Sequence, residues 1–118
     1  MYFSLAELEA SDRAVACYRD ESKSGHGTCT MISAFTPTEL HFGPPTVFKS
    51  GSTYFLKVAP LGADKIVVCY SDYSNPLQQC KCVALAVASG TETLKLGKTL
   101  TVSEERTDYL AVASLRMD

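Results

Sequence analysis

The sequence lacks the long apolar run and the charge imbalance that mark membrane-spanning and nucleic-acid-binding chains. Its longest purely apolar run, Val83 to Ala88, is far shorter than the roughly 20 residues that cross a bilayer. Eleven basic residues stand against 13 acidic ones, a net charge of −2 that offers no basic excess to nucleic acid. The composition, 46% apolar and 20% charged, is that of an ordinary globular domain. We therefore expect neither a membrane nor a nucleic acid as a partner.

The sequence also lacks the motifs of the common enzyme classes. It contains no Gly-x-Ser-x-Gly and no phosphate-binding loop of the Gly-x4-Gly-Lys-Ser/Thr type. It has two histidines, His26 and His41, which we expect in a loop and on an outer strand. Residues 1–9 have no basic start and carry two glutamates, so we expect no secretory signal and leave the compartment open. The sequence predicts no catalytic residue, no bound metal and no cofactor, and favours a protein that is not an enzyme.

An internal repeat of about 52 residues organises the chain. Cys17-Tyr18-Arg19-Asp20 recurs as Cys69-Tyr70-Ser71-Asp72, and Tyr2-Phe3 recurs as Tyr54-Phe55 at the same offset. Later matches lie slightly further apart, as expected when small insertions fall in loops. We therefore divide the chain into repeat unit 1 (1–53), repeat unit 2 (54–108) and the start of a third unit (109–118), and we expect a fragment of a longer repeat array.

Each unit has the pattern of four short strands. Val, Ile, Thr, Tyr and Cys dominate the apolar runs, and turn residues separate the runs every 8–12 residues. In unit 2 we expect strands at 54–59, 65–70, 80–87 and 92–96. The second run is continuously apolar, which predicts that both of its faces are covered. Residues 13–19 and 65–71 should be equivalent central strands.

The predicted fold class is all-β: two four-stranded antiparallel units like β-propeller blades, followed by the first strand of a third. A two-sheet β-sandwich is the alternative. Two units cannot close a propeller, which needs about four to eight blades. We therefore expect self-association or further repeats of a longer chain.

Five cysteines leave at least one thiol unpaired in a monomer. We favour buried thiols in a reducing compartment, with disulfides as the first alternative and metal binding by Cys80-Lys81-Cys82 as the second. Cys17 with Cys29, and Cys69 with Cys82, occupy matching positions on neighbouring strands. Each pair forms a cross-strand disulfide if the register places its members opposite each other.

The strand pattern Val-x-Cys-Tyr-x-Asp, followed by a Cys-bearing strand and a Ser-Gly-Thr turn, resembles a family of blade-type tandem repeats. These repeats occur in large, mostly uncharacterised proteins of marine algae and other protists. The resemblance covers nearly the whole chain and implies a β-propeller-like fold. It implies little about function, because one fold serves many functions.

The recurring polar residues are the candidate binding residues. Asp20 and Asp72 each follow Cys-Tyr-x at a strand end, where a carboxylate binds Ca²⁺ or a sugar hydroxyl or closes an Asx-turn with backbone N–H groups. Tyr18 and Tyr70 line sugar pockets between units or pack between neighbouring sheets; for both pairs the structural role is favoured. The leading functional prediction is a non-enzymatic binding or scaffold module with a glycan or protein ligand. A glycan-binding module and a hydrolase that uses a propeller channel are the alternatives.

Overall fold

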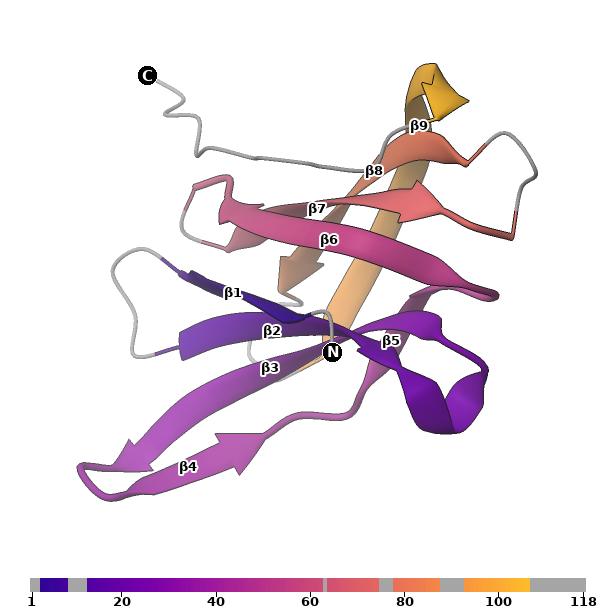
Figure 1. Ribbon diagram of the computed structural model, residues 1–118. Coiled ribbons are helices and arrows are strands. Elements are labelled where there is room, and N and C mark those ends of the chain that lie inside the picture. The colour runs from indigo at the N-terminus through magenta and orange to yellow at the C-terminus, as the bar shows by residue number, and fades with distance from the viewer. Residues whose placement is uncertain (1–2, 9–12, 63, 75–77, 88–92, 107–118) are drawn as a thin grey trace.

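The computed structural model describes residues 3–8, 13–62, 64–74, 78–87 and 93–106. These residues form two antiparallel sheets, one drawn above the other in Figure 1, and a single 3-10 turn, η1 (Glu21–Lys23). The prediction of an all-β chain is confirmed. The third unit expected at 109–118 lies outside the described residues.

Sheet one belongs to unit 1 and sheet two to unit 2. Sheet one has the order β1-β2-β3-β4, and β5 also pairs with β3; its strands are β1 (Phe3–Glu7), β2 (Arg13–Asp20), β3 (His26–Thr36), β4 (Glu39–Phe42) and β5 (Thr46–Lys49). Sheet two has the order β6-β7-β8-β9, with β6 (Thr53–Pro60), β7 (Lys65–Asp72), β8 (Gln79–Val87) and β9 (Leu94–Arg106). β2 and β7 are both central strands, as the repeat predicts.

The fourth strand differs between the sheets. In sheet one, Gly43-Pro44-Pro45 separates β4 from β5, and both pieces pair with β3. Proline has no N–H to donate and a fixed φ, so it interrupts a strand at this point. Unit 2 lacks these prolines, and β9 follows β8 along its whole length. The strand expected at 92–96 therefore extends to Arg106.

One hydrophobic core lies between the two sheets. Its members come from both: Ala6, Leu8, Val15, Cys17, Cys29, Met31 and Phe48 from unit 1, and Leu56, Val58, Ile66, Val68, Tyr70, Val83, Leu85, Val87 and Leu94 from unit 2. At one side of the core β1 lies beside β6, where the Val58 N–H donates a hydrogen bond to Ser4 Oγ at 3.1 Å. At the other side β9 reaches β3 and β5, passing behind the other strands in Figure 1.

The cysteines form disulfides, so the expectation of free thiols is wrong for four of the five. Cys17 lies opposite Cys29 and Cys69 opposite Cys82, and each pair is bonded with a Cα–Cα distance of 4.1 Å. This distance is that of the narrow, non-hydrogen-bonded pairs of an antiparallel ladder. Composition reveals the number of thiols but not the register that brings two of them together. Cys80 stays unpaired and is buried.

The positions of the disulfides show that the two units are packed in the same orientation. We call the face of each sheet that carries its disulfide the front face and the opposite one the back face. Directly paired residues of an antiparallel sheet share a face. Cys17 and Cys29 belong to the shared core, whereas Cys69 and Cys82 do not, because the core side of β7 carries Val68 and Tyr70. The front face of sheet one therefore packs on the back face of sheet two.

Two further expectations are corrected. Val67 is only half-buried, because it points to the front face of sheet two; both faces of β7 are covered only from Val68 to Asp72. His26 is not in a loop but is the first residue of β3, paired with Asp20. The turn before it is short because η1 occupies only three residues.

Candidate functional site

The repeated aspartates close the same turn in both units. Asp20 Oδ1 accepts hydrogen bonds from the Ser22 N–H at 3.1 Å and the Ser22 hydroxyl at 2.6 Å. Asp72 Oδ1 accepts the equivalent pair from Ser74, with the N–H again at 3.1 Å. Both are Asx-turns in which the carboxylate holds the backbone two residues further on. The structural role that the sequence favours for these residues is confirmed.

Asp72 has a second role, because its other oxygen joins the two sheets. Its side chain is buried, and Oδ2 lies 2.9 Å from Lys81 Nζ of β8 and 3.5 Å from Lys49 Nζ of β5. Burial alone would raise the pKa of the Asp72 carboxyl. The hydrogen bonds from Ser74 and Lys81 and the charges of both lysines outweigh burial, so the pKa lies below its usual value. The carboxylate is therefore ionised at neutral pH and links unit 2 to unit 1.

Tyr70 is a core residue. It is buried with its ring 5.2 Å from that of Phe48, so it packs β7 against β5. Burial and the nearby charge of Asp72 raise the pKa of Tyr70 to about 12, although a hydrogen bond with Thr99 acts against them. Its repeat partner Tyr18 lies half-buried on the back face of sheet one, where burial and the charge of Asp20 raise its pKa as well. The ligand-binding role of these tyrosines and aspartates stays a prediction.

An aromatic cluster of Tyr54, Phe55 and Tyr73 lies at the end of the molecule where β6 starts and β7 ends. The Tyr54 and Tyr73 ring centres are 4.5 Å apart, and Phe55 lies 6.2 Å from both. All three rings are half-buried. A bulge between Tyr54 and Lys57, with Phe55 at φ 51°, turns the start of β6 so that these adjacent residues meet Tyr73.

Arg19 covers this cluster. Its guanidinium carbon lies 4.1 Å from the centre of the Tyr54 ring, a cation–π contact, and its Nε pairs with Glu21 at 2.9 Å. The side chain is only 10% exposed, yet Nη1 has no hydrogen-bond partner among the described residues. Gly25 has φ 79°, a left-handed conformation that favours glycine, and a Cβ there would also displace the guanidinium. Sequence patterns do not predict this cluster, because only the bulge brings its members together; the recurrence of Tyr2-Phe3 as Tyr54-Phe55 was the one signal.

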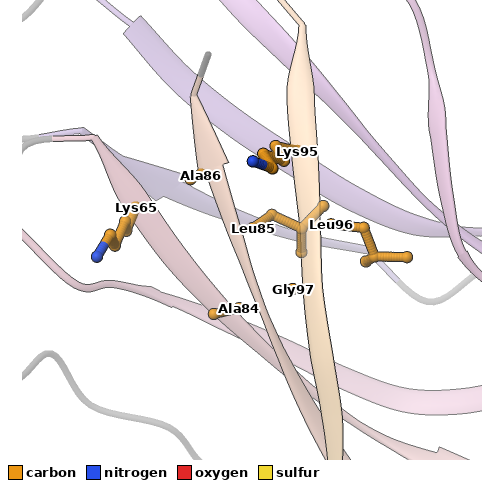
Figure 2. Close-up of a pocket in the computed structure, with 7 residues that line it drawn as sticks. All are labelled: Lys65, Ala84, Leu85, Ala86, Lys95, Leu96 and Gly97. Atoms are coloured by element: carbon orange, nitrogen blue, oxygen red, sulfur yellow. The ribbon is translucent and has the colours of Figure 1, made fainter. Parts of the chain in front are cut away.

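A hollow of about 210 Å³ lies on the front face of sheet two (Figure 2). Its floor consists of small residues, Ala84, Ala86 and Gly97, on neighbouring strands β8 and β9. The side chains of Lys65 and Lys95, which pair across the sheet through Ala86, flank it.

Metal and membrane features are absent from the part of the chain that the structure describes. No three His, Cys, Asp or Glu side chains among these residues lie close enough to hold a metal ion. The same residues contain no helix long and apolar enough to span a bilayer.

Burial raises the pKa of the Cys80 thiol, so this cysteine is protonated at neutral pH.

The comparisons with known proteins add no relative. No family model, no curated protein and no solved structure matches this chain. The resemblance to the protist repeats therefore stays a prediction from the sequence.

Proposed function

We propose that this chain is a non-enzymatic binding and scaffold module of a blade-type repeat protein. The observation that carries the proposal is the packing of two equivalent units in the same orientation. In a stack of blades or other repeats, the front of one unit covers the back of the next, and the order continues. In a sandwich with internal two-fold symmetry, the same face of both sheets would meet.

The contacts of the recurring polar residues support this proposal, because these residues hold the two sheets together. Asp72 uses its carboxylate to hold Ser74 and two lysines, one from each sheet, and Tyr70 is buried in the contact. These residues are the ones that the sequence singled out for ligand binding in unit 2. Their use in joining the two units supports a scaffold role.

A chain with a third unit tests this proposal. Residues 1–108 followed by a second copy of 54–108 place the back of the added unit next to the front of unit 2. Because repeat stability grows with each interface, we expect a higher melting temperature and a cooperative transition. As a control, the same chain with Leu94→Asp in the added copy should melt like the original, since that copy loses its packing face. An added unit that stays unfolded or leaves the melting temperature unchanged contradicts the proposal.

Glycan binding is the second candidate, and the aromatic cluster favours it. Half-buried rings of Tyr54, Phe55 and Tyr73 present an apolar platform with polar tips. A glycan array probed with the chain should give a signal that Tyr73→Ala abolishes. Leu40→Ala, which changes an exposed side chain on β4 away from the cluster, should leave the signal intact. An array without signal, or equal loss in both variants, removes this candidate.

A further inference from the structure

We propose that the chain associates head to tail with a second copy of itself, with the front face of sheet two on one copy against the back face of sheet one on the other. The inference rests on the proposed function, in which repeat units pack front to back, and it identifies the partner as a second copy of the chain. The two faces are those that take no part in the packing of unit 1 against unit 2. The front face of sheet two is exposed at Lys57, Lys65 and Lys95, although it is buried at Cys69 and Ser71. Each of the two faces is the repeat equivalent of a face that is already buried inside the molecule.

The back face of sheet one is an exposed apolar surface. By register, five of the large exposed apolar side chains lie on it: Phe3, Leu5, Leu40, Phe42 and Val47. Phe42 is 67% exposed and Leu40 62% exposed. Ile32, half-buried on β3, separates these edge residues from Ala14 and Ala16 of β2. A contiguous apolar patch of this kind on a sheet marks an interaction surface.

The existing interface shows what such a face packs against. On unit 2 the equivalent back face carries Ile66, Val68 and Leu85, all buried against the front face of sheet one. Leu94, the repeat partner of Leu40, is only 4% exposed there. Within this molecule, the back face of unit 2 is thus covered by the front face of unit 1. The front face available on a second copy is that of sheet two.

The shape of the front face of sheet two suits it to cover the back face of sheet one on a second copy. Met31 of sheet one is fully buried in the core, whereas its repeat partner Ala84 is small and leaves the floor of the hollow open. The hollow, about 210 Å³, accommodates a large apolar side chain (Figure 2). Leu40 and Phe42 of a second copy are the repeat equivalents of Leu94 and Leu96, of which Leu94 belongs to the same core cluster as Met31. They are the side chains that we expect to enter it.

The charges on the two faces are of opposite sign. By register, Lys57, Lys65 and Lys95 lie on the front face of sheet two. Glu7 and Asp20 lie on the back face of sheet one. Opposite charges at the rim of an apolar contact fix its orientation and oppose pairing of a face with itself. A contact between unlike faces is heterologous, so association continues into a ring or an open chain of copies.

Light scattering across a series of protein concentrations tests the inference. We expect a weight-average mass that exceeds one chain and rises with concentration. Phe42→Asp blocks the back face and Ala84→Arg fills the hollow, so each variant alone should have the mass of one chain. Lys23→Gln, in the exposed η1 turn, changes the net charge by the same amount as Phe42→Asp but away from both faces, and should associate like the parent.

The mixture of the two blocked variants gives the sharpest result. Each retains the face that the other has lost, so an equimolar mixture should form a complex of two chains and no larger species. Circular dichroism confirms that the variants are folded; if Ala84→Arg unfolds, the double charge reversal Lys65→Glu with Lys95→Glu replaces it.

Three results would overturn the inference: a parent chain that is monomeric at every concentration, association that survives both substitutions, and a mixture that stays monomeric. The three-unit chain described under the proposed function joins its units covalently, so its outcome is independent of this one. A stabilised three-unit chain with a monomeric parent refutes self-association alone.

Discussion

The two repeat units have the same strand order, the same disulfide position and the same aspartate turn, but their equivalent residues lie in opposite surroundings. Leu94 is buried and Leu40 is exposed, although each is the repeat partner of the other. The inner disulfide joins Cys17 and Cys29, and the outer one joins Cys69 and Cys82. Local sequence therefore determines the fold of each unit, and the packing of the two sheets determines which face of each unit is buried.

The aspartates extend this comparison to polar groups. Both close an Asx-turn, yet only Asp72 is buried and receives lysines from both sheets. Asp20 occupies the same place on the face of sheet one that the described strands of sheet two do not cover. An aspartate thus closes a turn in both units, but it joins the two sheets only in unit 2. Equivalent substitutions in the two units separate these roles.

The leucine pair should give the largest difference. Leu94→Ala removes buried side-chain volume from the shared core and should lower the free energy of unfolding by about 2–5 kcal/mol. Leu40→Ala removes the same atoms from an exposed edge strand and should change it by no more than about 0.5 kcal/mol. Urea unfolding of dilute protein measures both. Equal losses would mean that the two leucines have the same surroundings.

The aspartate pair should differ by a smaller amount. Asparagine preserves the turn hydrogen bonds, so Asp20→Asn should cost less than about 0.5 kcal/mol. Asp72→Asn also removes the charge that pairs with Lys49 and Lys81, and should cost about 1–3 kcal/mol. Thermal melts at neutral pH compare the variants. A smaller cost at Asp72 than at Asp20 would break the assignment of the interface role.

The dependence of stability on acidic pH tests the role of Asp72 further. Its pKa is lowered on folding, so its contribution to stability is present above about pH 4, the usual carboxyl value, and is lost as pH falls through the folded-state pKa. Unfolding curves between pH 5 and pH 2 should therefore decline less steeply for Asp72→Asn than for the parent. Identical slopes would show that the carboxylate gains nothing from its lysines.

The tyrosine pair should show the smallest effect at neutral pH. Tyr70→Phe removes a hydrogen bond with Thr99 and should cost about 1 kcal/mol, whereas Tyr18→Phe changes a half-buried side chain and should cost less. The raised pKa of Tyr70 gives stability that is full below about pH 10 and lost as pH rises towards 12, because the unfolded chain ionises first. Melts from pH 8 to pH 11 should show an alkaline decline that Tyr70→Phe reduces. A decline of equal size in both variants would contradict the burial of Tyr70.

Much of the unit could be predicted from the sequence, because the information is local. The strand at 65–70, the Asx-turn after Asp72 and the equivalence of the two central strands follow from patterns within a few residues. The disulfides depend on register and redox conditions, which composition does not reveal. The meeting of Phe55 with Tyr73 depends on a bulge. The half-burial of Val67 depends on which face the second sheet covers, and no local pattern contains that choice.

Reduction of the two disulfides in the folded protein tests the packing of units in one orientation most directly. The Cys69–Cys82 bond lies on the front face of sheet two, where Cys69 is buried but Cys82 only half-buried, whereas Cys17 and Cys29 are both fully buried in the core. Dilute protein is treated with a thiol reductant, and alkylated cysteines are counted by mass spectrometry over time. We expect Cys69–Cys82 to be reduced first, at a rate that follows the reductant concentration, and Cys17–Cys29 only at the rate of unfolding. Equal rates, or earlier reduction of Cys17–Cys29, would contradict the account.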